Sequence, residues 1–199
     1  MDDPLLESAI DHFGRDGFDA ASTRAIATAA NVAMSTITYR HGGKEGLYLA
    51  AAGYIADQIG VQIRPVLDLQ FDDPVEHVVA LVGGMANLML RDEAESWSRF
   101  IMREQMQPTA AFDLLWQNAM QHVVMLIERR FAEATGEGDP RAARIAAMTL
   151  IGQALVFRAA RAGVLRALDR PIIDEADMAM IHARIETNVR AILHRSETR

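Results

Sequence analysis

Residues 22–48 read STRAIATAANVAMSTITYRHGGKEGLY, and this stretch decides how the N-terminal part of the chain folds. Ser22 is a favourable N-cap for a short helix over residues 23–30, because its side-chain oxygen accepts a hydrogen bond from a free backbone N–H group. Asn31 tolerates the left-handed conformation that ends helices, and a second short helix fits residues 34–40. Two short helices joined by a tight turn, with a third helix before them, predict a helix-turn-helix unit.

The second short helix carries polar groups on its free surface. The apolar residues that would form the small core of the unit are Ile26, Ala29, Val32 and Ile37. The side chains left on the surface of the second helix are then those of Met34, Ser35, Thr36, Thr38, Tyr39 and Arg40. Hydroxyl groups and arginine suit base edges and phosphates in a major groove. Ser22 and Thr23 open the preceding helix, where free backbone N–H groups favour a phosphate. Helical proteins that bind no nucleic acid also contain this pattern, and Tyr39 would then pack against the first helix.

The helix that precedes this unit carries one apolar stripe, made of Leu5, Leu6, Ala9, Ile10 and Phe13. Glycine is a poor helix former, so we expect this helix to stop near Gly14 and Gly17. Phe18, the next apolar residue, should then tuck back beneath the helix.

The chain is acidic, but its charge is unevenly distributed. Its formal net charge is −7, which taken alone argues against a partner made of phosphates. Residues 2–19 hold six acids and one arginine, whereas residues 20–44 hold Arg24, Arg40 and Lys44 and no acid. Lys44, the one lysine of the chain, stands at the start of the next helix, where its charge opposes the helix dipole. An arriving phosphate would meet both the lysine and the helix amides, so we expect Lys44 to bind one.

The remainder of the chain predicts helices and no strands. Apolar residues recur at spacings of three and four, without alternating runs. Asp-Pro pairs at 73–74 and 139–140 mark two helix starts, and Pro65 marks a helix end. We expect three short helices up to residue 41 and then six longer ones, over 44–64, 74–91, 93–105, 108–135, 140–164 and 174–195. The predicted fold is all-α with about nine helices.

Composition limits the classes of protein to which the chain can belong. It contains no cysteine, which excludes disulfides, thiolate metal sites and cysteine nucleophiles. The N-terminus lacks a charged start followed by an apolar run, so we expect no signal peptide. No apolar stretch reaches about 18 residues without a charge, so we expect no membrane span. These features together predict a soluble cytoplasmic protein with no membrane partner.

The stretch over residues 22–48 resembles the N-terminal DNA-binding domain of the TetR family of repressors. The agreement with the family pattern lies at Arg24, Ile26, Ala27, Ala30, Val32, Ile37, Gly43, Lys44, Glu45 and Leu47. The departures are Asn31 for glycine, Ala33 for serine, Thr38 for tyrosine and His41 for phenylalanine. Ala33 loses a helix cap worth about 1 kcal/mol, and a buried His41 would need a hydrogen-bond partner.

The resemblance implies which residues contact DNA and how the domains divide. The family's DNA-contacting positions correspond to Thr23, Ser35, Thr36, Tyr39 and Lys44. With the surface argument added, the predicted DNA-binding residues are Ser22, Thr23, Arg24, Ser35, Thr36, Thr38, Tyr39, Arg40 and Lys44. The segments ITYRHGGKEGLYLA (37–50) and RFIMREQMQPTAAFDLL (99–115) are similar to the CecR-like branch, whose C-terminal domain carries a comparable R-E-Q-x-x-P-T-A segment. We expect a helix-turn-helix DNA-binding domain over residues 1–46 and a helical ligand-binding and dimerisation domain over residues 47–199.

The resemblance also implies a homodimer, for which the last two helices are suited. The helix over 140–164 offers small residues that permit close approach, namely Ala143, Ala147, Gly152, Ala159 and Gly163. The final helix offers an apolar stripe of Met178, Ile181, Ile185, Val189 and Ile192. Two such helices from each subunit would make a four-helix bundle. Alternatively, both stripes face the core of their own domain.

A ligand pocket is expected among the middle helices. Methionines and aromatic rings with a few polar groups suit an adaptable apolar site. The candidate ligand-binding residues are Met85, Met89, Phe100, Arg103, Phe112, Trp116, Met120 and Phe157. Alternatively, these side chains belong to an ordinary core. The pair Gly83-Gly84 within a helix would bend it, leave room for a ligand or permit close helix packing.

Enzyme classes find little support in the sequence. The segment DDPVE at residues 72–76 is similar to the acidic Mg²⁺ motif of helical terpene synthases, but helix capping by Asp73 explains it more simply. Asp73 and His77, four residues apart, would supply only two metal ligands. No phosphate-binding loop is present. We therefore expect no catalytic residues, no metal site and no cofactor.

We accordingly expect a TetR-like transcriptional regulator. It would be a repressor that binds a palindromic double-stranded DNA operator as a homodimer and is released by a small apolar or amphipathic effector. The alternative is a helical module that binds a ligand or a partner and whose helix-turn-helix no longer binds DNA.

Overall fold

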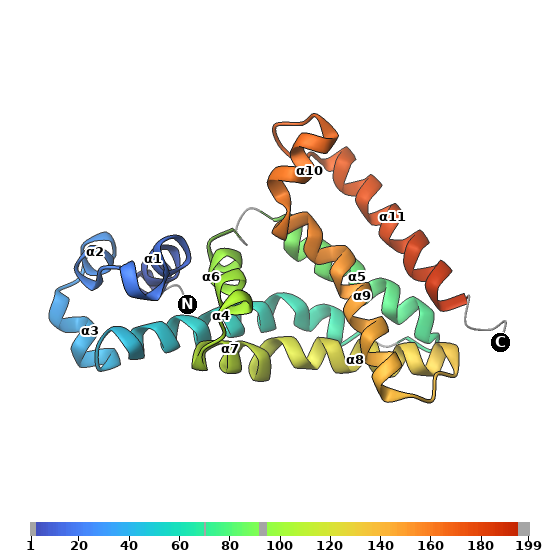
Figure 1. Ribbon diagram of the computed structural model, residues 1–199, viewed down its shortest axis with the longest axis horizontal. Helices are drawn as coiled ribbons and strands as arrows, with labels where there is room; N and C mark the ends of the chain where they lie inside the picture. The colour runs from blue at the N-terminus through green and yellow to red at the C-terminus, as the bar shows by residue number, and fades with distance from the viewer. Residues whose placement is uncertain (1–2, 70, 92–94, 195–199) are drawn as a thin grey trace. The chain divides into compact units, whose positions relative to one another are not determined.

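The computed structural model describes residues 3–69, 71–91 and 95–194, and over these residues the chain is helical, without strands (Figure 1). The N-terminal elements are α1 (Pro4–Ala20), α2 (Thr23–Ala29), α3 (Met34–His41) and α4 (Lys44–Leu67). The middle elements are α5 (Pro74–Leu90), α6 (Glu95–Met106), α7 (Ala110–Leu115), the π-helical turn η2 (Trp116–Met120) and α8 (Gln121–Thr135). The last elements are α9 (Pro140–Ala159), α10 (Arg161–Leu168) and α11 (Glu175–His194).

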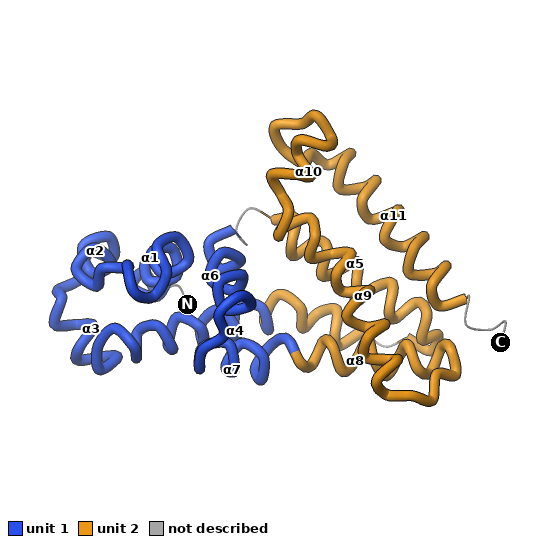
Figure 2. The backbone as a smooth tube through the Cα atoms, in the orientation of Figure 1, with its two compact units in different colours: residues 1–60, 93–120 blue, residues 61–92, 121–199 orange. Residues whose placement is uncertain are grey.

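The chain forms two compact units, coloured separately in Figure 2. Unit 1 comprises residues 1–60 and 93–120, and unit 2 comprises residues 61–92 and 121–199. The chain passes between the units three times, namely within α4 after residue 60, between residues 92 and 93, and between η2 and α8 after residue 120. Unit 1 therefore contains the predicted helix-turn-helix together with α6 and α7.

Both helices of the helix-turn-helix begin at the residues that the sequence predicts, and each ends one residue from its predicted end. The Ser22 hydroxyl accepts a hydrogen bond from the Ala25 N–H group at 3.4 Å and so caps α2. Asn31 adopts a left-handed conformation with φ of 54°, and Gly42 ends α3 with φ of 74°. Ala33, the N-cap of α3, makes no side-chain cap. Its departure from the family's serine therefore leaves the helix start without that hydrogen bond.

Three buried aromatic rings, those of Phe13, Tyr48 and Phe100, form the centre of unit 1, and Phe18, which is 37% exposed, packs at their edge. The ring of Tyr48 in α4 meets Phe13 of α1 edge-on at 4.8 Å and stacks on Phe100 of α6 at 4.6 Å, measured between ring centroids. Phe18 meets Tyr48 edge-on at 5.1 Å. Phe18 follows Gly17, whose φ of 83° kinks α1. The helix was expected to stop near Gly14 and Gly17, and it kinks at Gly17 only. Phe18 does return to stack on Phe13, with ring centroids 6.2 Å apart, but it remains exposed at the edge of this cluster.

Unit 2 is built from α5, α8, α9 and α11 together with the end of α4. Its core includes Leu81 and Val82 of α5, Ile127 of α8 and Leu150 and Ala154 of α9. Among the described residues, α9 alone is long and apolar enough to cross a membrane. Within unit 2 it packs against α5 and α8, and its buried residues there are Ala143, Ala147, Leu150, Ile151 and Ala154.

The predicted dimer stripes largely face this core. The buried members are Ala143, Ala147, Ile181, Ile185 and Val189. The other members are exposed or half-buried, namely Gly152, Ala159, Gly163, Met178 and Ile192. The sequence left open whether the stripes pack within their own domain or against a second subunit, and for the buried members the structure supports packing within the domain.

Helix boundaries differ from the prediction in three places. Pro65 was expected to end the fourth helix, but α4 continues to Leu67, because the amide of Asp68 still reaches the Arg64 carbonyl at 2.9 Å. The single helix predicted over 108–135 is divided, because η2 inserts a wider turn between α7 and α8. The helix predicted over 140–164 ends earlier, and α10 follows it as a separate element. The predicted start at residue 93 lies outside the described residues.

Gly84 allows α4 and α5 to pack closely. A Cβ atom added at Gly84 would lie 2.8 Å from Cγ2 of Val66, which is closer than packed atoms tolerate. At Gly83 the nearest such atom is Nδ1 of His182, at 3.9 Å. Of the three interpretations of this glycine pair, close helix packing therefore accounts for Gly84.

His41 replaces the family's phenylalanine at the end of α3. Its Nε2 atom is buried and has no hydrogen-bond partner among the described residues. Burial lowers the pKa of His41, and the positive charge of Arg40 lowers it further, while Asp3 acts in the opposite direction. The imidazole is therefore held in its neutral form at neutral pH.

We expect His41→Phe to stabilise the protein, and more so in acid. Removing the unsatisfied polar atom should raise the free energy of unfolding by about 1 kcal/mol at about pH 7.5. Because the folded protein protonates His41 less readily than the unfolded chain does, the wild type loses stability as the pH falls below about 6.5. The gap between the two proteins in urea-unfolding midpoint should therefore widen at about pH 5.5. His122→Phe at an exposed position is the control, and a His41→Phe gap that stays constant with pH would contradict this account.

Candidate nucleic-acid interface

Helix α3 turns its apolar residue inward and its polar residues outward. Ile37 is 1% exposed, whereas Tyr39 is 91% exposed. Ser35 and Thr38 are also exposed, and Thr36 is half-buried. Tyr39 therefore does not pack against the first helix, which was the alternative left open by the sequence. A helix with hydroxyls and a free aromatic side chain on its outer surface has the form of a helix that enters a major groove.

The start of α2, the helix that precedes α3 in the sequence, is also accessible to solvent. The Ser22 hydroxyl is exposed but already accepts the hydrogen bond that caps the helix. Thr23 is half-buried. Arg24 is exposed and makes no ion pair with any residue that the structure describes. The Arg24 guanidinium is thus open to a phosphate.

Arg40 is held by an acidic side chain at the beginning of the chain. Its Nη2 atom donates to Oδ2 of Asp3 at 2.5 Å, across 37 residues of sequence. Asp3 is also the N-cap of α1, since its Oδ1 accepts a hydrogen bond from the Leu5 N–H group at 3.1 Å. One carboxylate therefore joins the start of α1 to the end of α3.

Lys44 makes contacts within the fold that its position in the sequence did not predict. Its Nζ atom donates to the backbone carbonyl of Asp19 at 3.0 Å and lies 5.0 Å from the centroid of the Phe18 ring. The lysine thus fastens the start of α4 to the end of α1. An ammonium group carries three donors, so the phosphate contact predicted for Lys44 would add to this structural role.

Helix α6 is joined to α1 by Arg103. The guanidinium donates from Nε to the carbonyl of Gly14 at 2.8 Å and from Nη2 to the carbonyl of Arg15 at 2.6 Å. These carbonyls precede the kink in α1, where the regular helical hydrogen bonding is interrupted. Arg103 therefore satisfies backbone acceptors at this interruption.

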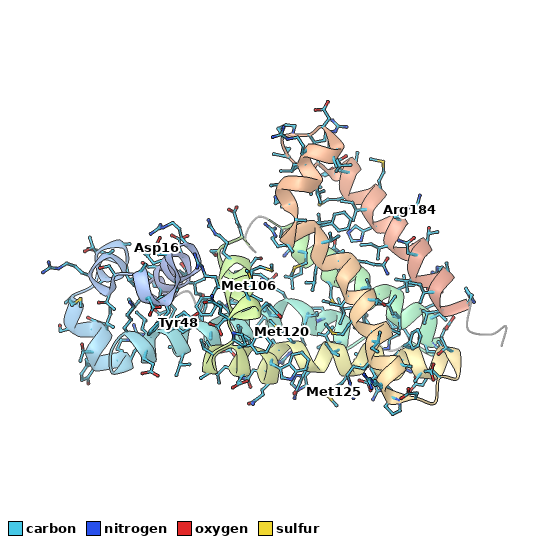
Figure 3. All side chains as sticks on the ribbon, viewed as in Figure 1. Asp16, Tyr48, Met106, Met120, Met125 and Arg184 are labelled. Atoms are coloured by element: carbon cyan, nitrogen blue, oxygen red, sulfur yellow. The ribbon has the colours of Figure 1, made fainter. Side chains whose placement is uncertain are left out.

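The next residue, Glu104, joins α6 to two further helices. Glu104 is buried, with 2% of the residue exposed. Its carboxylate accepts a hydrogen bond from the Tyr48 hydroxyl at 2.5 Å. It also accepts hydrogen bonds from the backbone N–H and the hydroxyl of Thr109, at 3.0 and 2.9 Å. Tyr48, labelled in Figure 3, projects from α4, and Thr109 caps α7. Burial raises the pKa of Tyr48 above its usual value, and the hydrogen bond to Glu104 adds to this effect.

The predicted ligand-binding residues are divided between the two units. Unit 1 contains Phe100, Arg103, Phe112, Trp116 and Met120, whereas unit 2 contains Met85, Met89 and Phe157. Phe100 and Arg103 already serve the packing of unit 1. Phe112 and Trp116 stack with ring centroids 6.4 Å apart. Met85 and Phe157 pack against the core of unit 2, and the Met89 carbonyl accepts a hydrogen bond from Arg158 at 2.7 Å.

Asp3 and Tyr48 were not predicted as functional residues from the sequence. An acid directly before Pro4 is a recognisable helix-start signal, so the capping role of Asp3 was available from the sequence. Its pairing with Arg40 was not, because that contact depends on how α1 packs beside α3. Tyr48 lies within an apolar stretch, and no local pattern marks it as the partner of a carboxylate 56 residues away.

Family comparisons match both parts of the chain. The family described as "Bacterial regulatory proteins, tetR family" matches residues 5–51. The family described as "HTH-type transcriptional dual regulator CecR, C-terminal domain" matches residues 74–195. The HTH-type transcriptional dual regulator CecR of Shigella flexneri is 33% identical over 201 residues, which cover 95% of this chain and 89% of that protein.

Solved structures share the fold at low sequence identity. AibR in complex with isovaleryl coenzyme A and operator DNA superposes with a TM-score of 0.64 and 20% identity, over 78% of this chain and 84% of that chain. FadR from Bacillus subtilis in complex with stearoyl-CoA superposes with a TM-score of 0.63 and 14% identity, over 94% of this chain and 96% of that chain. The matched families are families of regulators and not of enzymes. The chain belongs to the TetR family of transcriptional regulators, in its CecR-like branch.

Proposed function

We propose that this regulator is a cytoplasmic repressor that binds a palindromic operator as a homodimer. A DNA-binding domain over residues 1–46 would read the operator, and a domain over residues 47–199 would bind the effector and the second subunit. The observation that carries the proposal is the outer face of α3. Its hydroxyls and Tyr39 are directed away from the protein, within a segment of sequence that contains no acid.

The contacts with DNA would divide between phosphates and base edges. Arg24 and Arg40 supply guanidinium groups at the start of α2 and the end of α3, which suit phosphates. Ser35, Thr36 and Tyr39 lie on α3 between them in the sequence, where a helix placed in the major groove presents its side chains to bases. Ser22, Thr23, Thr38 and Lys44 would complete the interface at its margins.

Exposed apolar side chains of α9 and α11 support the dimer. They lie on the faces of these helices that unit 2 leaves uncovered, and they are Ile145, Met148, Leu155, Val156, Met180 and Ile192. Apolar surface of this kind on two neighbouring elements is typical of a protein interface. A second copy that brought the same two helices would cover it in a four-helix bundle. The proposed interface therefore uses Ile192 of the predicted stripes together with residues next to them, rather than their buried members.

The effector is proposed to be a small amphipathic molecule, with acyl-CoA thioesters as the first class to test. AibR and FadR, which share the fold, were solved with isovaleryl coenzyme A and stearoyl-CoA. The candidate residues that would supply apolar contacts are Phe100, Phe112, Trp116 and Met120 within unit 1, and Met85, Met89 and Phe157 within unit 2. Arg103 would act mainly through its hold on α1. Release of DNA then requires that the effector bind one conformation more tightly than the other.

Substitutions should separate the two kinds of DNA contact. We expect Arg24→Ala to weaken binding to every duplex and to lower the salt slope by about 0.9 for each phosphate that the variant no longer neutralises. Thr36→Ala should instead reduce discrimination between the chain's own upstream DNA and an unrelated duplex, with the slope unchanged. Fluorescence anisotropy over a range of salt concentrations measures both quantities. Arg166→Ala in α10 removes the same charge outside the proposed DNA-binding domain over residues 1–46, here called the head, and is the control. If Arg24→Ala and Thr36→Ala both behave like this control, α3 and α2 do not form the DNA-binding face.

Acyl-CoA should release the upstream DNA. At saturation we expect isovaleryl-CoA or stearoyl-CoA to weaken DNA binding by roughly 5- to 150-fold, the usual range of allosteric coupling. Free coenzyme A should have little effect, because it lacks the acyl chain that would enter an apolar site. The same anisotropy assay with each compound tests this. Equal effects of coenzyme A and its thioesters, or no effect of any of them, would exclude acyl-CoA as the effector class.

A further inference from the structure

We propose that Asp3 lowers the DNA affinity of the head. It holds Arg40 in an ion pair, so that a phosphate contacting Arg40 when α3 docks on DNA must share that guanidinium with the Asp3 carboxylate. The inference rests on the proposed DNA-binding face and adds to it a residue that opposes binding. It starts from the contact of 2.5 Å between Arg40 Nη2 and Asp3 Oδ2. This is the one ion pair that the structure shows, within its described residues, for the three cations of residues 20–44.

The Asp3 carboxylate is fixed in place by two partners. Oδ1 accepts from the backbone of Leu5 at the start of α1, while Oδ2 accepts from Arg40. Burial raises the pKa of Asp3, but the hydrogen bonds from Arg40 and Leu5 outweigh that effect, and the pKa is lowered overall. The side chain of Asp3 is 23% exposed and that of Arg40 is 43% exposed. A charged carboxylate is therefore held against a guanidinium that solvent, or a phosphate, can still reach.

The head has few cations with which to replace Arg40. Lys44 is engaged by the Asp19 carbonyl and the Phe18 ring, which leaves Arg24 and Arg40 as the guanidinium groups of residues 20–44. A guanidinium has five N–H donors, so Arg40 keeps donors for a phosphate while one of them serves Asp3. Half of the positive charge available from arginine in this segment is thus opposed by a carboxylate.

Docking on a duplex then brings like charges together. A phosphate within hydrogen-bond distance of Arg40 also lies near the Asp3 carboxylate, and the two negative charges repel each other. The carboxylate weakens the contribution of Arg40 to every duplex equally, because phosphate contacts carry no sequence information. Discrimination among operators is left to the hydroxyls and Tyr39 of α3. The opposite role, in which Asp3 orients Arg40 toward a phosphate, would give the opposite change in affinity when the charge is removed.

Asp3→Asn tests the proposal without removing the helix cap. Asparagine caps helices as well as aspartate does, so the substitution removes the charge and keeps the hydrogen bond to Leu5. Asp57→Asn is the matched control, because Asp57 is exposed and lies about 20 Å further along α4 than Lys44 at 1.5 Å per residue. Both variants change the net charge by the same amount. Their thermal melts, followed by circular dichroism, check that the fold is retained.

We expect Asp3→Asn to bind an unrelated duplex roughly two- to five-fold more tightly per head than Asp57→Asn, given the usual strength of an exposed ion pair. The dependence of affinity on salt should steepen by up to about 0.9 per head. In an Arg40→Ala background, Asp3→Asn should behave like Asp57→Asn, because the residue that Asp3 restrains is then absent.

The proposal is overturned if Asp3→Asn binds no more tightly than Asp57→Asn, or if the gain persists without Arg40. In either case, a weaker affinity of Arg24→Ala and a weaker discrimination by Thr36→Ala would show that the DNA-binding face itself is correct. If those variants and Arg40→Ala all bind as the wild type does, the proposed face fails together with this inference.

Discussion

The buried carboxylate of Glu104 is the constraint on which unit 1 depends. A carboxylate taken out of water is costly unless hydrogen bonds replace its hydration, and Glu104 receives three, from Tyr48 and from the amide and hydroxyl of Thr109. These partners belong to α4 and to the start of α7. Because hydrogen bonds to a charged group are strong and Glu104 is buried, these bonds hold α4, α6 and α7 of unit 1 together. The aromatic stack of Tyr48 on Phe100 reinforces the same junction.

Arg103 extends this junction to the first helix. It binds the carbonyls of Gly14 and Arg15 immediately before the kink at Gly17, and Gly14 lies against the backbone of α6 so closely that a Cβ atom there would be 3.1 Å from the Ser96 carbonyl oxygen. Helix α6 and the first half of α1 therefore cannot move independently without breaking charge-assisted hydrogen bonds. The rest of the head is attached to α1 through α2 and through the Asp3–Arg40 pair. A change in the position of α6 would thus be passed through α1 to α3, as the proposed control of DNA binding by a ligand requires.

Local patterns in the sequence predicted the helices of the head. The features that these patterns did not predict depend on contacts between residues far apart in the sequence. Ser22, Asn31 and the glycines after His41 act on neighbouring residues, so the boundaries of α2 and α3 follow from them. The all-helical fold follows in the same way from apolar spacing. The stripes of α9 and α11 could not be assigned, because a stripe of small or apolar residues has the same appearance whether it faces its own core or a second subunit. The turn η2 carries no glycine or proline that would have marked it.

In the candidate site, too, the sequence predicted local features and not the contacts between distant residues. The outward direction of Ser35, Thr38 and Tyr39 follows from the burial of Ile37 on a helix, and the sequence predicted it. The roles of Asp3, Lys44 and Arg103 did not follow, because each of these side chains binds a partner at least 25 residues away. The R-E-Q-x-x-P-T segment was recognisable by resemblance alone. Its chemistry lies in contacts between helices, because Arg103 of α6 donates to carbonyls of α1, and Glu104 of α6 accepts hydrogen bonds from Tyr48 of α4 and from Thr109, the cap of α7.

The most direct test of the junction is hydrogen–deuterium exchange in Glu104→Gln, which keeps the shape of the side chain and removes its charge. If Glu104 fixes α6 against α4 and α7, the substitution should also loosen the contact of α6 with α1. Amide exchange should then accelerate together at the start of α7, in α4 around Tyr48 and in α1 around Gly14 and Arg15. Acceleration confined to the start of α7, with α1 and α4 exchanging as in the wild type, would mean that Glu104 is a local helix cap and that α6 is tied to the head by other contacts.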